Sequence, residues 1–376
     1  MAGIYIHIPF CKKRCNYCNF FSSPSLGCKE NLISAIRKEI LLQRDYLRRE
    51  KISTIYFGGG TPSLLTYEEI MSIFEDLHKC HTISQNVEIT LECNPEDLTK
   101  FKIDEIKRTP VNRISIGVQS FFDEDLNYLK RVHTVKNSLN AIKNLQDKGY
   151  KNLTIDLIYG IPSLKNENWI YNLDTAFYLN IPHISTYCLT VENKTQLQSQ
   201  IKKGKVRTPD ERKVVEQFEI LMKMMKFNNY IHYQISNFCL DGFISVHNSN
   251  YWKGEKYLGL GPSAHSFDGI SRQWNIDNNA KYIDYIDRNS IPFTVETLTP
   301  IDKYNEYIMV SLRTMWGCDI DHIKHNFGEK FSKYCLNQAK LDLRNGLLIN
   351  YMNKISLTDK GKVFADRVAS NLFMIK

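Results

Sequence analysis

Residues 4–18 read IYIHIPFCKKRCNYC, a strand-like run followed at once by Cys11, Cys15 and Cys18. Three thiolates on one short loop can hold three irons of a 4Fe-4S cluster, and the fourth iron is then open to chelate a small molecule. A zinc site and buried free thiols are the competing interpretations. Zinc usually takes four ligands in paired clusters, and no CxxC partner follows this run. The spacing therefore favours an iron–sulfur site at the start of the chain.

The composition is that of a folded protein with more than one domain. The 376 residues are 43% hydrophobic and 24% charged, which is enough for a large core and unlike a disordered chain. The formal net charge of +8 is spread without a dense basic tail. Such a charge is weak evidence that the protein binds nucleic acid, but it suits an acidic partner or a ligand that bears carboxylates.

The other cysteines and the first residues predict a cytoplasmic location. Seven cysteines are scattered as in a reduced protein rather than a disulfide scaffold, at positions 28, 80, 93, 188, 239, 318 and 335. The opening MAGIYIHIPF lacks the basic region and the cleavage site of a signal peptide. No apolar run reaches the length of a membrane span.

Six runs rich in β-branched and aromatic residues alternate with amphipathic, helix-like stretches. The strand candidates are Ile4–Ile8, Thr54–Phe57, Val87–Glu92, Arg113–Gly117, Leu153–Ile158 and His183–Leu189, and the helix candidates include Asn31–Arg48, Tyr67–His78 and Val135–Lys148. This alternation indicates a parallel sheet in an α/β fold. Its order and length favour a partial (β/α)6 barrel similar to a TIM barrel, with a doubly wound open sheet as the alternative.

Unusual residues lie at the ends of five successive predicted strands. Cys11 follows the first strand, GGGT at 58–61 follows the second, Glu92 ends the third, Gln119 follows the fourth and Asp156 lies late in the fifth. Glycines let the backbone approach a ligand closely, and a carboxylate can accept from ribose hydroxyls or an ammonium group. Because barrel enzymes place their chemistry at the C-terminal ends of strands, we expect a single site at this rim.

The pattern changes after Pro209. Residues 210–227 predict a helix, and residues 230–274 predict a long irregular segment of the kind that is often functional. From Pro300 onward, helices at 301–315 and 331–345, a hairpin in LLINYMNKISL and a last helix from Lys360 predict a winged-helix-like α+β domain. The wing lacks a basic cluster, so DNA binding is not expected. The predicted domains are 1–230, 231–299 and 300–376.

Seven stretches together carry a family resemblance: YIHIPFC, GGGTPS, LECNPE, ISIGVQSF, LKRVH, TIDLIYGIP and GLGPSAHS. With them the chain resembles the radical S-adenosylmethionine (SAM) superfamily and, within it, the oxygen-independent coproporphyrinogen III oxidase family of porphyrin biosynthesis. The resemblance implies SAM on the open iron, where one electron cleaves it to a 5′-deoxyadenosyl radical. The residues implied around SAM are Tyr5, Tyr17, Gly59, Gly60, Thr61, Glu92, Gln119, Arg131 and Asp156.

The motif HNSNYW at 247–252 resembles the HNxxYW pattern of the haem-chaperone branch of this family, called HemW. Imidazole is a good ligand for haem iron, and neighbouring aromatic rings can pack on a porphyrin. The resemblance implies haem as cargo, bound by His247, Tyr251 and Trp252. On the residues alone, a capping histidine beside core aromatics is the competing interpretation. Other candidate ligands are His7, His133 and His265.

Two departures separate the chain from the decarboxylating oxidase of the same family. Phe20 stands where the oxidase has a further cysteine, and no long arm precedes Cys11. Both favour the haem chaperone over the oxidative decarboxylation of coproporphyrinogen III, which stays the alternative function, so whether the chain is an enzyme stays open. The predicted partners are haem, an acceptor protein such as a respiratory haemoprotein, and an electron donor such as flavodoxin or ferredoxin. A membrane surface is a further candidate.

Overall fold

Six parallel strands form the centre of the fold. In the computed structural model, which describes residues 1–375, they are β1 (Ala2–Ile8), β2 (Ile52–Gly59), β3 (Ile83–Cys93), β4 (Arg113–Gln119), β5 (Leu153–Tyr159) and β6 (His183–Cys188). They lie side by side in chain order, each parallel to the next. A doubly wound sheet reverses its strand order near the middle. The sequential order therefore confirms the predicted partial barrel and excludes the open sheet.

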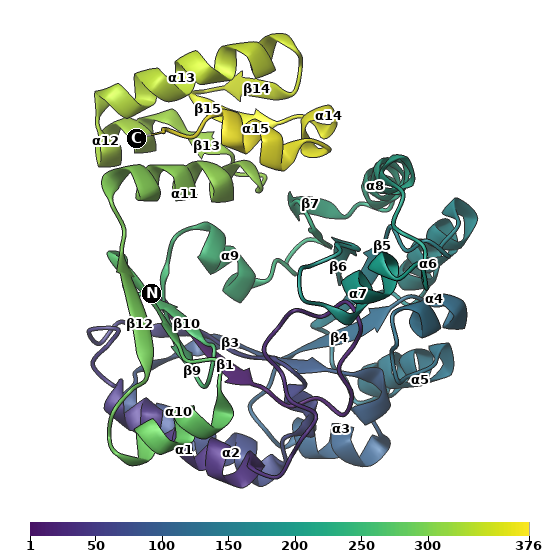
Figure 1. The fold of residues 1–376 in the computed structure, drawn as a ribbon, viewed down its shortest axis with the longest axis vertical. Coiled ribbons are helices and arrows are strands. Elements are labelled where there is room, and N and C mark those ends of the chain that lie inside the picture. Colours follow the sequence, from purple (N-terminus) through teal and green to yellow (C-terminus); the bar gives the residue numbers. More distant parts are fainter. Residues whose placement is uncertain (376) are drawn as a thin grey trace.

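Helices cover the outer face of these strands (Figure 1). They are α1 (Lys29–Leu42), α2 (Tyr67–Cys80), α3 (Lys100–Lys107), α4 (Asp123–Tyr128), α5 (Val135–Asp147), α6 (Asn166–Tyr178) and α8 (Glu211–Phe227). The apolar stripe of each longer helix packs on the sheet, as Ile36 and Leu77 show by their complete burial. The predicted helix at 31–48 was too long: α1 ends at Leu42, and Arg48 and Arg49 adopt φ angles of 50° and 63° in the following turns.

The sheet continues beyond both ends of the six-stranded barrel. The added strands are β7 (Ile231–Gln234), β8 (Asn237–Cys239), β9 (Lys256–Leu260), β10 (His265–Phe267), β11 (Ser271–Asn275) and β12 (Phe293–Thr297), with helices α9 (Val246–Trp252) and α10 (Asn279–Asp287) between them. Strand β9 pairs with β1, and β8 pairs with β6. The expectation of an irregular segment at 230–274 was therefore wrong. Its short strands are stabilised by pairing with distant strands, which no local pattern reveals.

The C-terminal part forms a smaller α+β unit with a core of its own (Figure 1). It contains α11 (Pro300–Leu312), α12 (Ile320–Phe327), α13 (Glu329–Arg344), α14 (Asp359–Lys362), α15 (Ala365–Asn371) and the sheet β13–β15–β14 (Cys318–Asp319, Lys354–Leu357, Leu348–Tyr351). The predicted helices at 301–315 and 331–345 and the hairpin are confirmed. The predicted last helix from Lys360 is divided into α14 and α15, and the short helix α12 was missed. The boundaries at 230 and 299 stay predictions.

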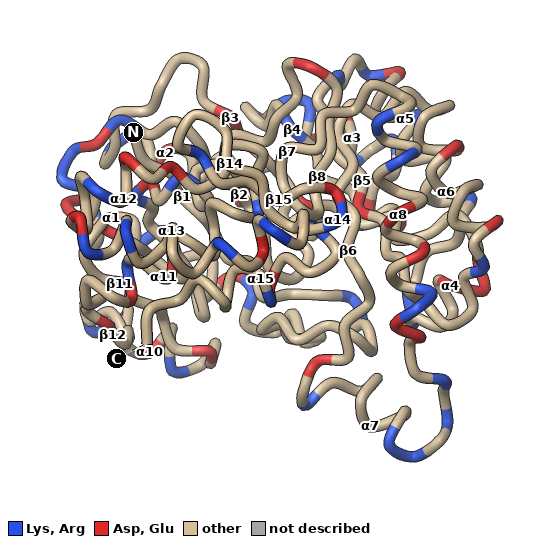
Figure 2. The backbone as a smooth tube through the Cα atoms, turned by 90° about the horizontal axis from the view of Figure 1, so that it is seen from above, with Lys and Arg blue, Asp and Glu red and all other residues tan. Residues whose placement is uncertain are grey.

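One segment stands away from the body of the molecule. Figure 2 shows α7 (Gln196–Lys202) on a projecting excursion between β6 and α8, with several Lys and Arg residues along it. Within residues 1–375, no helix combines the length and the apolar character that crossing a membrane requires.

Candidate functional site

A cavity of about 430 Å³ opens at the C-terminal ends of the barrel strands. The predicted residues that line it are Cys11, Cys15, Tyr17, Cys18, Gly59, Gly60, Thr61, Glu92, Gln119, Arg131 and Asp156. They come from the loop after β1, from β2 to β5, and from the segments that follow β2 and α4, which are separate in sequence. The structure thus brings all three cysteines and eight of the nine predicted SAM-binding residues to one cavity, as expected for the rim of a barrel.

The three cysteines lie on one wall of this cavity as free, half-buried thiols. Burial raises the pKa of the Cys11 and Cys18 thiols. Arg131 donates from Nη1 to the Cys15 sulfur at 3.3 Å, so a half-buried cation contacts the loop. Each iron of a cluster takes its own thiolate, and an adjacent guanidinium would offset the negative charge of a thiolate-bound cluster. The donor set therefore fits a 4Fe-4S cluster.

The zinc interpretation finds no support in the described part of the chain. Over residues 1–375, no group of three or more His, Cys, Asp or Glu is placed to hold a single metal ion. A structural zinc site needs four such ligands around one ion.

The glycine run after β2 lets the cysteine loop lie directly on that strand. Gly60 donates its amide to the Ile8 carbonyl at 2.9 Å. A Cβ at Gly60 would come within 2.6 Å of the Phe10 carbonyl oxygen, a backbone atom that cannot move aside. Only glycine therefore fits between β2 and the start of the cysteine loop.

Two half-buried carboxyl groups, those of Glu92 and Asp156, line the cavity. Glu92 accepts from the Tyr56 hydroxyl at 2.7 Å and from the Gly59 amide at 3.2 Å. Burial, together with the charge of Asp156, raises the pKa of Glu92 to about 7. Burial likewise raises the pKa of Asp156 to about 7. Polar groups buried at this depth require partners, and a ligand with hydroxyl or ammonium groups would supply them.

The end of β4 is shaped around the guanidinium of Arg131. Arg131 Nη2 donates to Asn94 Oδ1 at 2.7 Å and to the Gly117 carbonyl at 3.0 Å. Gln119 follows with a φ of 68°, an uncommon angle for a residue other than glycine. Such backbone strain persists where the surroundings hold it in place and is frequent at ligand sites.

Comparisons with known proteins show the family to which the chain belongs. The model of the radical SAM superfamily matches residues 5–175, and that of the HemN C-terminal domain matches residues 298–364. The heme chaperone HemW of Bacillus subtilis is 31% identical over 372 residues, which cover 98% of each chain. The chain belongs to the HemW family of radical SAM proteins.

Two further comparisons bear on the family and the fold. HemW of Lactococcus lactis is 31% identical over 357 residues, which cover 95% of this chain and 93% of that protein. The solved structure of coproporphyrinogen III oxidase (HemN) from Escherichia coli superimposes with a TM-score of 0.85 and covers 99% of this chain and 90% of that one. At 21% identity this likeness shows the fold alone.

The HNSNYW motif of this HemW family member lies inside the barrel rather than on the cavity wall. His247 is buried at the start of α9, accepts or donates at Nδ1 with Thr54 at 2.8 Å, and contacts the Tyr251 hydroxyl through Nε2 at 3.0 Å. Burial lowers the pKa of His247 to about 3, so the imidazole is neutral. Both ring nitrogens of His247 thus have hydrogen-bond partners within the protein, Thr54 and Tyr251.

Two side chains of the motif carry a buried polar atom without a hydrogen-bond partner among the described residues, the hydroxyl of Ser249 and the indole N–H of Trp252. Within residues 1–375 no partner accepts from the buried Nε1 of Trp252. A buried donor without a partner is unfavourable, and the penalty disappears when a ligand accepts from it.

The remaining predicted site residues, Tyr5 and three histidines, contact other parts of the protein. Tyr5 lies beneath the cavity, with its ring 2.9 Å from the position that a Cβ on Gly58 would take. His7 bonds to the Phe21 carbonyl at 2.9 Å, and His133 bonds to the Val118 carbonyl at 3.1 Å. His265 on β10 stacks on Trp274 of the neighbouring strand β11, with ring centroids 5.8 Å apart.

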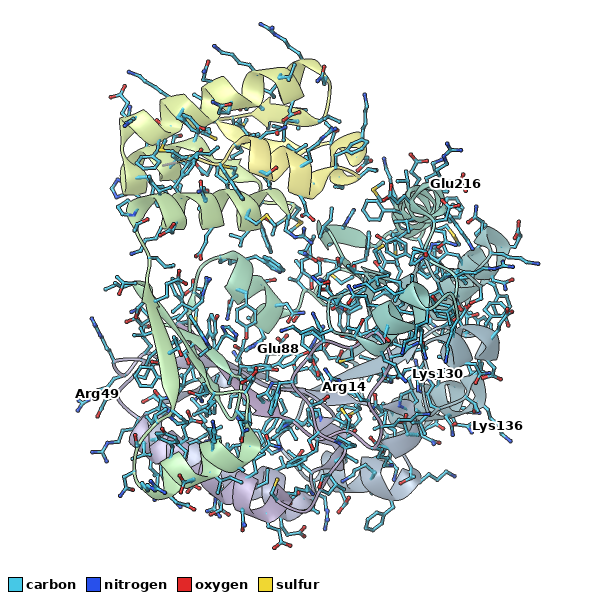
Figure 3. All side chains as sticks on the ribbon, in the orientation of Figure 1. Arg14, Arg49, Glu88, Lys130, Lys136 and Glu216 are labelled. Atoms are coloured by element: carbon cyan, nitrogen blue, oxygen red, sulfur yellow. The ribbon has the colours of Figure 1, made fainter. Side chains whose placement is uncertain are left out.

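Sequence reasoning missed residues that connect the motif to the barrel. Glu88 accepts from the backbone amides of Val246 and His247 at 3.0 and 2.8 Å, and Figure 3 shows it beneath α9. Tyr56 bonds to Glu92 and stacks on His247. Each is a single polar residue in a strand, so the only available signal was the alternation that turns both side chains into the barrel.

Proposed function

We propose that this chain is a haem chaperone that binds a 4Fe-4S cluster through Cys11, Cys15 and Cys18, holds SAM beside it, and transfers haem to an acceptor protein. The observation that carries the proposal is the cavity in which the cysteine loop, the glycine run and the carboxyls of Glu92 and Asp156 meet. The cluster and SAM, when bound, would supply the one-electron chemistry of the superfamily.

In this proposal, residues of the chain bind the cluster and SAM, orient them and shield them from water. Glu92 and Asp156 would accept hydrogen bonds from hydroxyl or ammonium groups of SAM, since both carboxyls face the cavity. Arg131, fixed by Asn94 and the Gly117 carbonyl, would hold positive charge beside Cys15. Thr61 receives a hydrogen bond from Asn94 at 3.0 Å, which ties the glycine run to the end of β3.

Haem binding by His247 rests on the family and on the motif. The named HemW relatives are heme chaperones, and the unpaired indole of Trp252 could donate to a haem propionate. For Nε2 of His247 to reach iron, the Tyr251 hydroxyl must first leave it, because that contact is 3.0 Å long. Helix α9 must also shift, because His247 is only 2% exposed. Haem loading is thus proposed to be coupled to movement of α9.

Anaerobic reconstitution with ferrous iron and sulfide tests the cluster. We expect a broad charge-transfer absorbance that Cys18→Ser abolishes. Cys28→Ser is the matched control, because Cys28 is also a free, half-buried thiol but does not line the cavity. Equal loss of absorbance in both variants would contradict the assignment.

Titration of the reconstituted protein with haem tests the cargo. Haem should bind the wild type and His265→Ala and shift the Soret band of haem in both. With His247→Ala this shift should be lost.

Anaerobic turnover with coproporphyrinogen III, SAM and a reductant tests the alternative function. Formation of protoporphyrinogen would show a coproporphyrinogen III oxidase and overturn the chaperone proposal. The acceptor, the membrane contact and the cytoplasmic location stay predictions.

A further inference from the structure

A second cavity, of about 220 Å³, lies where the C-terminal unit meets the β7 edge of the large sheet. Figure 1 shows β7 just beneath the C-terminal unit. Within residues 1–375, no residue of the proposed cluster, SAM or haem sites lines this cavity. Its lining residues with polar side chains are His232, Gln234, Arg313, Thr314, Ser356 and Lys362.

Main-chain hydrogen bonds join the walls of the second cavity. The amide of Ile235, in the turn after β7, donates to the carbonyl of Arg313 at 2.9 Å. The amide of Met315 donates to the carbonyl of Tyr233 at 3.0 Å. The end of β7 and the segment after α11 are therefore fastened to each other beside the cavity.

A neutral imidazole holds an ammonium group at this cavity. Lys362 Nζ lies 3.2 Å from Nδ1 of His232, and Nε2 of the same ring lies 3.2 Å from the Ile235 carbonyl oxygen. An ammonium can only donate and a carbonyl can only accept, so Nδ1 accepts and Nε2 carries the proton. Burial, together with the charge of Lys362, lowers the pKa of His232 to about 3. The positive charge of Lys362 is therefore positioned by His232 without being neutralised by it.

The charged groups that line the second cavity are all cations. Arg313 and Lys362 line it, whereas no Asp or Glu of the described chain does. Their ion-pair partners, Asp366 and Asp359, stand outside the lining with side chains 74% and 68% exposed. Because exposed ion pairs are weak, a ligand can compete with these acids for both cations.

Two uncharged donors in the lining have no partner within the protein. Gln234 is only 3% exposed, and its Oε1 accepts from the amide of Ser236 at 2.9 Å and from Nδ2 of Asn237 at 2.6 Å. Its Nε2 and the hydroxyl of Ser356 have no hydrogen-bond partner in the part of the chain that the structure describes. A covered donor without a partner is unfavourable, and a ligand that accepts from it removes the penalty.

We propose that the second cavity binds a phosphate group, either free phosphate or that of a small monoester. A guanidinium, an ammonium, an amide and a hydroxyl from four separate segments line it, and Arg and Lys are the usual partners of phosphate. A tetrahedral anion accepts hydrogen bonds from several directions, whereas the acceptor sites of a carboxylate lie in one plane.

The size and the position of the cavity define the ligand further. Pockets for drug-sized ligands measure about 300–1,000 Å³, so a cavity of about 220 Å³ selects a smaller anion. Gln234 belongs to the large sheet, whereas Ser356 and Lys362 belong to the C-terminal unit. A bound phosphate group therefore links the two parts of the protein.

Isothermal titration calorimetry with inorganic phosphate tests the site, at constant ionic strength in chloride buffer. The full-length protein is compared with the double variant Arg313→Gln and Lys362→Gln. The matched control is Arg344→Gln with Lys360→Gln, which makes the same change of charge at exposed residues that do not line the cavity.

We expect the double variant to raise the Kd for phosphate at least about tenfold, because it removes hydrogen bonds to a charged group. The control should change the Kd less than about twofold. Ser356→Ala removes a hydroxyl without a protein partner, so it should fold like the wild type and raise the Kd several-fold. No phosphate binding by the wild type, or equal Kd values in the double variant and its control, would overturn the proposal. If the double variant does not fold, an unchanged Kd in Ser356→Ala would overturn it.

Two further ligands identify the source of the anion. Tighter binding of glycerol 3-phosphate than of inorganic phosphate, lost in the double variant, would support the proposal and assign a monoester. Acetate that binds as tightly as phosphate, with the same dependence on Arg313 and Lys362, would show a carboxylate site and overturn the proposal.

The cysteine variant Cys18→Ser separates this inference from the proposed function. It should lose the cluster and bind phosphate like the wild type, because Cys18 does not line the second cavity. Loss of phosphate binding in Cys18→Ser would place the anion at the cysteine site and overturn the inference. A wild type that assembles no cluster but binds phosphate through Arg313 and Lys362 would defeat the proposed function alone.

Discussion

The imidazole of His247 lies against the ring of Tyr56, with ring centroids 4.8 Å apart and 24° between the planes. The hydroxyl of the same tyrosine donates to Glu92 Oε1 at 2.7 Å. One side chain thus touches both a predicted SAM-binding residue and the predicted haem ligand. The two predicted sites are neighbours inside one barrel rather than separate regions of the protein.

Replacing Tyr56 with Phe keeps the ring against His247 and removes the donor to Glu92. Because that hydrogen bond lowers the pKa of Glu92, the variant should hold this carboxyl protonated to a higher pH. We expect SAM affinity at neutral pH to fall by about tenfold, the typical effect of one hydrogen bond to a charged group, while haem affinity changes little. Isothermal titration calorimetry with each ligand checks this. Tyr56→Ala, which also removes the stacked ring, should lower the affinity for both SAM and haem. An unchanged SAM affinity in Tyr56→Phe would contradict the role of Glu92.

Replacing Tyr251 with Phe frees Nε2 of His247 from its hydroxyl partner. If this nitrogen ligates haem iron, the competing contact at 3.0 Å disappears and haem affinity should rise several-fold, on the order of one neutral hydrogen bond. The measurement is a Soret titration of the reconstituted protein. Tyr257→Phe serves as the control, since Tyr257 packs edge-on against Tyr251 with centroids 4.7 Å apart. Weaker haem binding in Tyr251→Phe would show that the hydroxyl supports haem rather than competes with it.

The stability of the ligand-free protein should depend on pH through Glu92 and Asp156. Burial raises the pKa of each to about 7, above the usual value of about 4 in an unfolded chain. The folded state therefore binds protons more tightly, and this stabilisation is full below about pH 4 and is lost as the pH rises through about 7. The free energy of unfolding should fall across this window by at most about 4 kcal/mol per group, which is about 1.4 kcal/mol for each unit of pKa shift.

Urea denaturation at a series of pH values measures this dependence. Glu92→Gln and Asp156→Asn should each flatten the slope, whereas the exposed Asp147→Asn should leave it as in the wild type. SAM affinity should rise over the same range, because ionised carboxylates accept hydrogen bonds better. A wild-type slope that neither substitution alters would place the two carboxyls in contact with solvent.

Replacing Gly60 with Ala should disrupt the cysteine loop. The added Cβ would lie 2.6 Å from the Phe10 carbonyl oxygen and 2.8 Å from that of Ile8, so the loop backbone must move. We expect cluster reconstitution to fall severely, with a loss of stability of about 1–3 kcal/mol from overpacking. Gly27→Ala is the matched control in the same loop, because the nearest atom to its Cβ would be 3.8 Å away. The iron and sulfide content per chain and the thermal midpoint of unfolding are measured in both variants. An equal loss in Gly60→Ala and Gly27→Ala would contradict the prediction.

Much of the candidate site could be predicted because its residues follow strands. Cys11, Gly60 and Glu92 stand at strand ends in the sequence, and parallel strands bring their ends to a common rim. The position of His247 could not be predicted in this way. It depends on Glu88 and Thr54 receiving α9 inside the barrel, contacts between residues that are far apart in the chain.

The sequence by itself determined the parallel barrel, the cysteine loop and the family, because alternation, spacing and motifs are local properties of the chain. Tertiary structure alone decided that β9 pairs with β1, that the amide of Leu197 in the excursion bonds to Asn16 in the cysteine loop, and that His247 is buried with both ring nitrogens hydrogen-bonded. The physical reason is that pairing and burial depend on which distant surfaces meet, and no local pattern carries that information.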